Sequence, residues 1–515
     1  MKIKSVTIVG GGSAGWMTAA LLSKYSNIKI ILVESKKIKT IGVGESTLQK
    51  FNELLNRLEL DDSEWMPKCK ATYKTSIAFK NWREGQGERF QYPFGRYDLT
   101  DTYKSNAIEF FLLRAKFGKK LYPYEEFSRF VNHNTFIAEK SKIPINSDMS
   151  IGNFNLADDI AYHLDAELFG KYLRDEHCIP NGVIHKLTEI KDVILNSDGS
   201  ISKLITVDNE NIESDLYVDC TGFKSLLLEK YLNVPFYSFE NELFNDSAIK
   251  ANIKYNNIES EMSTYTDNVA LNNGWCWNIP LWDRIGTGYV YSSKYTSQEK
   301  AENEFKQYLS KRFFKNKSKG FNSEVDEKVE FEHIKIKHGK HDVAWKKNCV
   351  AIGLSYGFLE PLESTGLLTS HQCAIVLCDT LVRRDSFVTQ FDIDFFNNST
   401  DAMMDTYKNF VLAHYTLSQR TDTEYWRDCL KVSTSKDSMN KIMKFDSSEN
   451  DGLLYIAAGL GNNPLNEKYV LQQISNDKNV DKLHEQWQQH RKTIMKWVDN
   501  QPTHYQFLKD NIYSK

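Results

Sequence analysis

Three glycines near the start of the chain, Gly10, Gly12 and Gly15, have the spacing GxGxxG, which suits a loop that binds a dinucleotide. The first glycine permits a tight turn, the second lets the backbone approach a pyrophosphate, and the third allows close helix packing. The helix that follows offers free N–H groups and a positive dipole end to the phosphates. Glu34, at the end of the next apolar stretch, is suited to accept hydrogen bonds from ribose hydroxyls. The predicted cofactor-binding residues here are Gly10, Gly12, Ser13, Ala14, Gly15, Glu34 and Ser35.

The elements around this loop have the order that a dinucleotide site requires. Residues 5–9 (SVTIV) predict a buried parallel strand, residues 16–25 a helix, and residues 28–34 (IKIILVE) a second strand. A late apolar strand that runs into a glycine turn, at 218–223 (VDCTGF), resembles the strand with which flavoprotein hydroxylases return to FAD. The chain has one complete GxGxxG, so FAD is favoured over NAD.

Two tryptophans form a second unusual feature, in the stretch GWCWNIP at residues 274–280. Residues two apart on a strand point to the same side, so Trp275 and Trp277 should face one way and Cys276 the other. The pair either fills a core or forms a rigid wall.

Bulk composition excludes several classes. The 515 residues carry a formal net charge of −3, which gives no basic field for nucleic acid. The 8 cysteines are scattered as in a reducing compartment, and no His, Cys or Asp spacing indicates a metal. No stretch predicts a membrane span or a signal peptide. We expect a soluble cytoplasmic protein.

The organisation predicted along the chain is α/β: a Rossmann-like FAD-binding domain of the flavoprotein monooxygenase type, with a mainly helical C-terminal region on the substrate side. We place the first domain at 1–370, with an aromatic and weakly periodic insert at about 85–150, and the helical region at 371–515. Residues 161–176 predict an amphipathic helix, and NSDG at 196–199 predicts a hairpin turn between two strands.

Several blocks together resemble the flavin-dependent halogenases, the tryptophan-halogenase-like family. They are GGGSAGWM (10–17), GVGEST (42–47), WMPKCKATYKTSIAFKNW (65–82), HLDAELFGKYL (163–173), DCTGF (219–223), GWCWNIP (274–280), NCVAIGLSYGFLEPLESTG (348–366) and HYTLSQRTDTEYW (414–426). These blocks are spread over most of the chain, and the Trp-x-Trp-x-Ile-Pro block distinguishes the family.

The resemblance implies a mechanism. Reduced FAD reacts with O₂ to give a flavin hydroperoxide, and a halide (chloride, bromide or iodide) attacks it to yield hypohalous acid. The acid travels to a lysine, which matches Lys74 and either hydrogen-bonds the acid or holds the halogen as a haloamine. A glutamate that matches Glu363 assists electrophilic substitution on an aromatic substrate by stabilising or deprotonating the cationic intermediate. A separate NAD(P)H-dependent reductase supplies the reduced flavin.

The resemblance also assigns supporting roles. Backbone N–H groups of Thr365 and Gly366 hold the halide, and three residues complete the flavin site: Ser46, Leu354 and Leu367. A barrier and tunnel between flavin and substrate are formed by Trp275, Trp277, Ile279, Pro280, Pro361 and Ser364. Such a barrier separates a halogenase from a hydroxylase, in which the substrate must meet the flavin directly.

The residues themselves leave alternatives open. Without the flanking blocks, Lys74 is typical of a solvated strand lysine, and Glu363 of a glutamate stabilised at a helix N-terminus. An apolar run after Thr365 and Gly366 predicts a helix whose first amides could bind an anion. His163 and His371 are predicted to be structural.

The substrate is predicted only as an electron-rich arene of indole or phenol type, because the insert does not match the tryptophan-specific members. Tyr425 and Trp426 are candidate pocket residues, with core packing as the alternative, and further candidates are Phe90, Tyr92, Phe94 and Tyr97. The alternatives in function are a flavin-dependent aromatic hydroxylase and a non-catalytic flavin-binding protein. Ring position, halide preference and self-association stay open.

Overall fold

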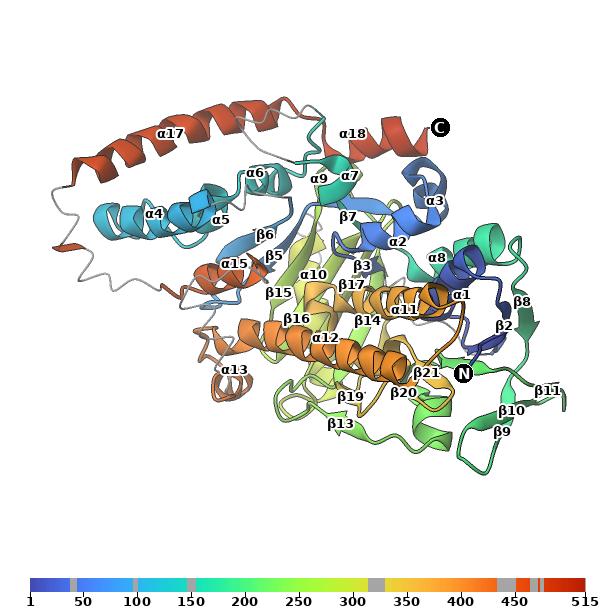
Figure 1. Ribbon diagram of the computed structural model, residues 1–515. Coiled ribbons are helices and arrows are strands. Elements are labelled where there is room, and N and C mark those ends of the chain that lie inside the picture. The colour runs from blue at the N-terminus through green and yellow to red at the C-terminus, as the bar shows by residue number, and fades with distance from the viewer. Residues whose placement is uncertain are drawn as a thin grey trace. The chain divides into compact units, whose positions relative to one another are not determined.

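The computed structural model describes residues 1–37, 44–95, 101–145, 154–313, 329–432, 451–463, 471–472 and 477–514. The ribbon, coloured by residue number, shows its helices and strands (Figure 1). The chain divides into two compact units, each assembled from three separate stretches. The first unit comprises residues 1–71, 164–243 and 337–408, and the second comprises 72–163, 244–336 and 409–515. The single boundary expected at residue 370 is therefore replaced by interleaved segments, because strands far apart in sequence pair within each unit.

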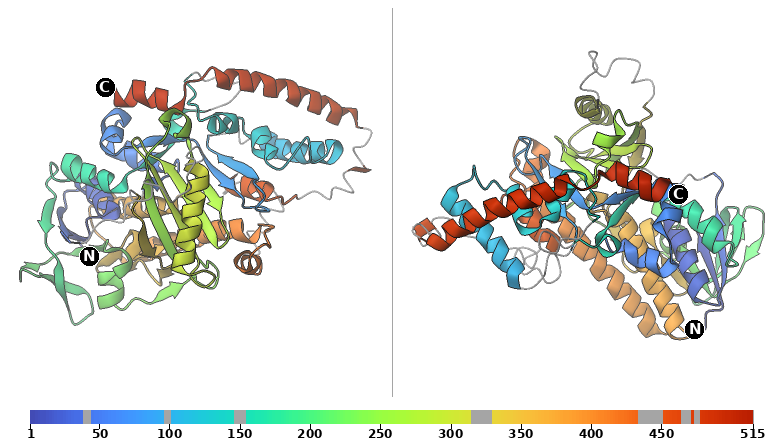
Figure 2. Two further views of the ribbon diagram at one scale, coloured as in Figure 1. Left: turned by 180° about the vertical axis from the view of Figure 1, so that it is seen from behind. Right: turned by 90° about the horizontal axis from the view of Figure 1, so that it is seen from above.

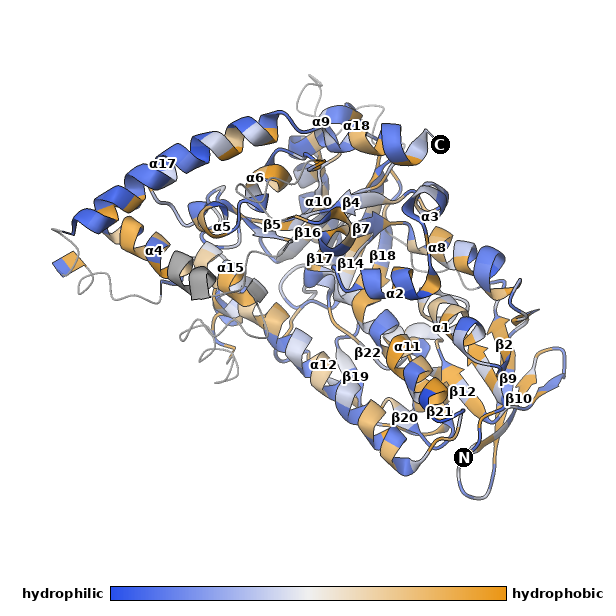
Figure 3. Ribbon diagram, turned by 45° about the horizontal axis from the view of Figure 1, so that its top comes forward, coloured by the Kyte–Doolittle hydropathy of each residue, from blue (hydrophilic) through white to orange (hydrophobic). Residues whose placement is uncertain are grey.

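The first unit is built on a six-stranded sheet in the order β20-β21-β12-β1-β2-β8. Its strands are β1 (Ser5–Val9), β2 (Lys29–Glu34), β8 (Ile184–Leu187), β12 (Leu216–Asp219), β20 (Trp345–Lys346) and β21 (Cys349–Ala351). All neighbours pair in parallel except β20 and β21. Val, Ile and Leu dominate the central strands, which are orange in Figure 3, as expected for strands covered on both faces.

Helices and small sheets complete the first unit. The helices are α1 (Ser13–Tyr25), α2 (Phe51–Leu58), α3 (Asp62–Lys68), α8 (Ala166–Tyr172), α11 (Thr365–Arg383) and the first part of α12 (Gln390–Thr416). The remaining strands are β3 (Glu45–Ser46), β9 (Ile190–Leu195), β10 (Ile201–Thr206), β11 (Asn211–Ile212), β13 (Phe236–Ser238), β19 (Gly339–His341) and β22 (Gly357–Phe358). β9 and β10 form the predicted hairpin, with Gly199 at φ +82° in its turn.

The second unit contains a seven-stranded sheet in the order β18-β14-β17-β16-β15-β5-β6. Its strands are β5 (Ser76–Lys80), β6 (Arg89–Pro93), β14 (Ser247–Ile253), β15 (Tyr265–Ala270), β16 (Gly274–Pro280), β17 (Ile285–Tyr291) and β18 (Glu332–Lys335). Helix α10 (Gln298–Phe313) packs on one face of this sheet (Figure 2). A short ladder joins β4 (Thr72–Lys74) to β7 (Ala161–Leu164). The strand at 161–164 corrects the helix predicted from 161; helix α8 starts at Ala166.

The other helices of the second unit are α4 (Asp101–Phe117), α5 (Glu126–Val131), α6 (Asn134–Glu139), α7 (Leu156–Asp159), α9 (Ile258–Glu261), α13 (Glu424–Cys429), α15 (Asp451–Gly459), α17 (Lys478–Asp499) and α18 (His504–Leu508). Within the described part of the 85–150 stretch, strand β6 is followed by the three helices α4, α5 and α6, so this part has regular structure. Its aromatic residues Phe110, Phe111 and Phe127 share a core with Tyr455 of α15 and Trp487 of α17. α17 is mostly hydrophilic elsewhere (Figure 3). In the described part of the chain no helix is both long and apolar enough to cross a membrane.

Candidate active site

The dinucleotide loop of the first unit lies where parallel strands end together. Val9 of β1 is in register with Val33 of β2 and with Asp219 of β12. The N–H of Gly10 donates to the Val33 carbonyl at 2.9 Å, and the N–H of Cys220 donates to the Val9 carbonyl at 2.8 Å. The carboxyl edge of a parallel sheet is where such folds bind their ligands.

The glycines of this loop are required by its geometry. Gly10 has φ +117°, and a Cβ there would lie 2.1 Å from the carbonyl oxygen of Cys220. A Cβ on Gly15 would lie 2.0 Å from the carbonyl oxygen of Gly10, whereas at Gly12 it would meet nothing within 4 Å. Gly12 thus leaves open space at the start of α1, which has no side-chain cap. An uncapped helix end beside exposed backbone fits a pyrophosphate.

Glu34 and Ser35 follow at the end of β2. A carboxylate oxygen of Glu34 lies 2.9 Å from Nε2 of His185, which holds the side chain at this edge. The hydroxyl of Ser35 donates to Glu189 at 3.1 Å. Glu34 therefore has a fixed position with a second carboxylate oxygen available to a ribose, whereas Ser35 is already engaged.

A second segment of the first unit approaches the same loop. A Cβ on Gly353, at φ +70°, would lie 3.0 Å from Cβ of Ala14 and 3.0 Å from the hydroxyl of Ser370 on α11. Leu354 follows and is half-buried, while Leu367 is buried in the first turn of α11. The open backbone, the uncapped α1 terminus and Glu34 together fit FAD.

Helix α11 begins with the residues expected to hold a halide. Ser364 precedes it at φ +59°, a left-handed conformation unusual for serine. The Ser364 hydroxyl donates a hydrogen bond to the Ser46 hydroxyl at 3.0 Å. No side chain caps the helix, and a Cβ on Gly366 would meet nothing within 4 Å. The first amides, including those of Thr365 and Gly366, thus offer an N-terminus suited to an anion. This hydrogen bond joins Ser46 to the residue that precedes α11, and Pro361 is the first residue of the 3₁₀ turn before Ser364.

Glu363 ends the short 3₁₀ turn Pro361–Glu363, next to this helix start. It is 1% exposed. Burial of a carboxylate carries a desolvation cost that its hydrogen bonds must offset, so Glu363 differs from an exposed helix-capping glutamate. It belongs to the first unit, whereas Lys74 belongs to the second.

Lys74 is 0% exposed, on strand β4 of the second unit. Its Nζ lies 5.0 Å from the centre of the Phe94 ring. A solvated strand lysine, the alternative from sequence, is excluded by this burial. Full burial of a lysine is rare in proteins and points to function.

Two buried histidines support the strand that carries Lys74. His163 accepts or donates through Nε2 to the Thr266 hydroxyl at 2.9 Å, and His504 accepts the N–H of Tyr73 at 3.1 Å. Burial, followed by the charges of Lys74 and His504, holds the pKa of His163 well below its usual range. Burial also lowers the pKa of His504 to about 4. Both rings are therefore neutral at pH 7, and the structural role predicted for His163 is confirmed.

His371 of α11 packs edge-on against Phe51 at 5.5 Å, with its pKa lowered to about 3 by burial. Its predicted packing role is confirmed.

The two tryptophans face the same side of the seven-stranded sheet. Trp275 and Trp277 have ring centres 6.3 Å apart, and a Cβ on Gly288 would lie 2.1 Å from the Trp277 ring. Cys276 points to the other face, where it packs with α10, as expected.

Ile279 shares the tryptophan side by strand alternation, but Pro280 lines a cavity on the opposite face. Pro280 therefore does not extend the wall.

Tyr425 and Trp426 are core residues rather than pocket residues. The Tyr425 hydroxyl donates to Asn245 at 3.0 Å and the Trp426 indole N–H to the Leu271 carbonyl at 2.8 Å. Both side chains are at most 1% exposed. Because their polar atoms are hydrogen-bonded within the core, Tyr425 and Trp426 are not available to contact a substrate.

Of the other aromatic candidates, Phe94 lies beside Lys74. Phe90 and Tyr92 pack against Phe79 and Tyr455, and Tyr97 falls outside the described residues.

An ionic cluster on the α10 face was not predicted. Arg89 and Arg312 both contact the buried carboxylate of Asp267, at 2.7 Å and 2.5 Å. The three residues come from β6, α10 and β15, and no local pattern joins them. The one signal in the sequence is an aspartate at a core-facing position of an otherwise buried strand.

Comparison with known proteins gives a consistent result. The family model described as tryptophan halogenase matches residues 5–472. The chain is 35% identical to 7-chloro-L-tryptophan 6-halogenase KtzR of Kutzneria sp. (strain 744), over 82% of this chain and 81% of that protein. The solved structure of VirX1 in its apo form superposes with a TM-score of 0.90 at 42% identity and covers 100% of both chains. The tryptophan 6-halogenase SttH from Streptomyces toxytricini superposes with a TM-score of 0.83 at 31% identity, over 98% of this chain and 99% of that one.

Proposed function

Because the chain belongs to the tryptophan halogenase family and is a flavin-dependent halogenase, we propose that it halogenates an electron-rich arene of indole type, with Lys74 and Glu363 as catalytic residues. The observation that carries this assignment is the complete burial of Lys74 beside Phe94. Such a position costs free energy that a non-catalytic flavin-binding protein has no reason to spend.

FAD would be held by the Gly10–Gly15 loop, Glu34 and the Leu354 segment, and in its reduced form it supplies, with O₂, the oxidising equivalents that turn a halide into hypohalous acid. The amides of Thr365 and Gly366 bind the halide. The reduced flavin comes from a separate NAD(P)H-dependent reductase, since the sequence holds one dinucleotide loop.

Lys74 orients the hypohalous acid by donating a hydrogen bond to it, and Glu363 accepts the ring proton. In the balanced step the C–H and O–halogen bonds break and the C–halogen bond forms. The ring proton, accepted first by Glu363, ends on the hypohalous oxygen, which leaves as water. The buried carboxylate of Glu363 also stabilises the cationic ring before that proton leaves. Trp275, Trp277 and Ile279 keep the arene from the flavin, which favours halogenation over direct hydroxylation.

The test combines the purified chain with FAD, a flavin reductase, NADH, one halide at a time and a panel of L-tryptophan, indole and a phenol. Mass spectrometry should show a mass gain that depends on the halide. A hydroxylated product formed without halide would instead assign the chain as an aromatic hydroxylase.

Substituting Lys74→Met tests the role of the lysine, because methionine fills similar space without the ammonium group. We expect FAD binding to persist and halogenated product to fall by about 100-fold or more, the range of a positioned proton donor. Lys306→Gln, on α10, is the control, since the Lys306 amine pairs with Glu302 at 2.8 Å on that helix. Full product yield from Lys74→Met would refute its catalytic role.

A further inference from the structure

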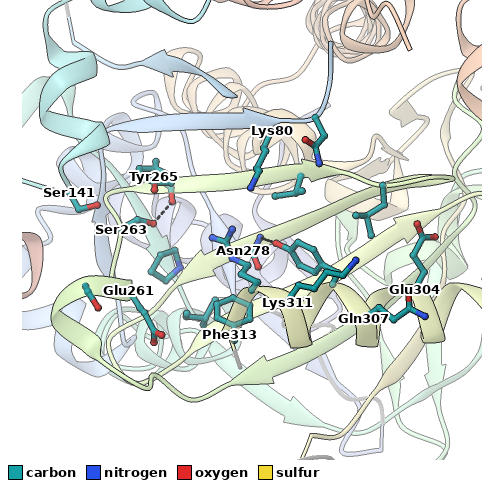
Figure 4. A pocket seen from close by; sticks show the side chains of 18 of the residues that line it. Lys80, Ser141, Glu261, Ser263, Tyr265, Asn278, Glu304, Gln307, Lys311 and Phe313 are labelled. Carbon is teal, nitrogen blue, oxygen red and sulfur yellow. Dashed lines mark hydrogen bonds between the residues drawn. The ribbon is translucent and has the colours of Figure 1, made fainter. Parts of the chain in front are cut away.

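A cavity of about 610 Å³ lies in the second unit between the seven-stranded sheet and α10 (Figure 4). Its floor includes Val269 and Asn278 of the sheet, and its helical wall includes Tyr308 and Arg312. Strand alternation puts this cavity on the face opposite Trp275 and Trp277. Lys74 does not line it.

The charge beside this cavity is not balanced. Arg89 and Arg312 share one buried carboxylate, that of Asp267, so the three groups carry a net charge of +1. The Nε–H groups of both arginines are buried and have no acceptor within the described parts of the chain. A cluster with surplus positive charge and unused donors is suited to an anion.

Two lysines add to this surplus from opposite walls. Lys80 reaches from β5 and Lys311 from α10 into the same space (Figure 4). Neither has an ion pair among the residues that the structure describes. The positive charge of Lys80 also helps to lower the pKa of Asp267.

The acidic residues that line the cavity are engaged elsewhere. Glu304 accepts from the Tyr289 hydroxyl at 2.9 Å and from the Asn272 N–H at 3.0 Å. Glu261 accepts the Asn256 N–H at 2.8 Å, which anchors the start of α9. These carboxylates are fixed by neutral donors, and the structure shows no ion pair between them and either lysine among the described residues. They keep their charge, so Arg89, Arg312, Lys80 and Lys311 against Asp267, Glu261 and Glu304 leave a net charge of +1 around the cavity.

The rest of the lining is mixed: amide and hydroxyl side chains alternate with apolar ones, and the size of the cavity limits its ligand. Leu271, Ile285 and Phe313 contribute hydrocarbon surface next to the cationic groups. A single halide ion is far smaller than about 610 Å³ and would leave this surface unused.

We propose that this cavity binds an organic anion, with a phosphate or carboxylate at Lys80, Lys311 and Arg312 and an apolar body against Leu271, Ile285 and Phe313. The site is separate from the residues assigned to halogenation and does not rest on that assignment. It gives the chain a second ligand, whose class follows from the charge and hydrocarbon surface of the cavity.

The experiment measures binding to the full chain loaded with FAD, by isothermal titration with phenyl phosphate, phenylacetate and neutral phenol. Loading with FAD fills the other phosphate site. We expect saturable binding of phenyl phosphate or phenylacetate, and the tighter of the two identifies the anionic group. Lys80→Gln and Lys311→Gln should each weaken it about tenfold, the value of one charge-assisted hydrogen bond.

The matched control is Lys306→Gln, which removes the same charge from the same helix outside the cavity. Its affinity should stay within about twofold of the parent, since it loses only long-range attraction. Three results would overturn the proposal: no saturable binding of either anion, phenol binding as tightly as phenyl phosphate, or Lys306→Gln weakening binding as much as Lys311→Gln.

Discussion

The two faces of the seven-stranded sheet differ more than their shared strands would suggest. On one face Trp275 and Trp277 form a buried aromatic surface, and on the other Asp267, Arg89 and Arg312 form an ionic cluster beside a cavity. Neighbouring residues of one strand, such as Trp275 and Cys276, thus belong to different environments. Because side chains alternate, a single sheet can keep apolar and ionic regions apart without any further layer.

The largest effect should come from the aromatic face. Trp275→Ala removes an indole that is 0% exposed and packs against Trp82, so the apparent free energy of unfolding should fall by about 4 kcal/mol. Denaturant titration measures it, and the loss should not depend on salt because no charge is removed.

Trp282→Ala is the control for that substitution. Trp282 is half-buried and stacks on Tyr513 at 3.7 Å, outside the aromatic wall. Trp282→Ala should lower the free energy of unfolding by less than half as much as Trp275→Ala. An equal loss would show that Trp275 is not better packed than Trp282.

A slightly smaller effect is expected on the ionic face. Asp267→Asn leaves two guanidinium groups without their carboxylate and should cost about 3 kcal/mol, less than for a fully buried pair because both arginines are partly exposed. Added salt should recover part of the loss, in contrast to Trp275→Ala. A cost independent of salt would contradict the ionic description of this face.

The sequence predicted one face of the sheet better than the other. The Trp275/Trp277 pair and the outward Cys276 followed from the period of a strand, as did the Gly10–Gly15 loop, since both are local patterns. The Asp267 cluster and the division into two units depend on pairing between distant segments, such as Val269 with Lys80. Pro280 was misplaced because the family motif was treated as one surface, although strand alternation divides it between the two faces.

A third substitution tests how tightly the wall is built. A Cβ on Gly288 would lie 2.1 Å from the Trp277 ring and 2.6 Å from the Ile249 carbonyl oxygen, so Gly288→Ala must displace the indole. We expect a loss of about 2 kcal/mol from overpacking, with a changed near-ultraviolet circular dichroism signal. An unchanged signal would show that the indole does not rest on this glycine.

The smallest effect uses pH to compare the strand that carries Lys74 with the ionic face. Burial lowers the pKa of His504 to about 4, so between pH 7 and 5.5 the unfolded chain takes up a proton that the folded chain does not, and stability falls. On the ionic face, burial opposes ionisation of Asp267, but Arg312 and Arg89 outweigh it and hold its pKa below the usual range. The stability that Asp267 contributes is therefore lost only at more acidic pH.

Replacing His504→Gln keeps an acceptor for the Tyr73 N–H but removes the titration. The loss of stability between pH 7 and 5.5 should shrink by about 1 kcal/mol relative to the parent, as measured by denaturant titration at each pH. His333→Gln, at an exposed position of β18, should leave the loss unchanged. If both variants keep the full loss, the neutral histidine beside the strand of Lys74 is not a source of acid sensitivity.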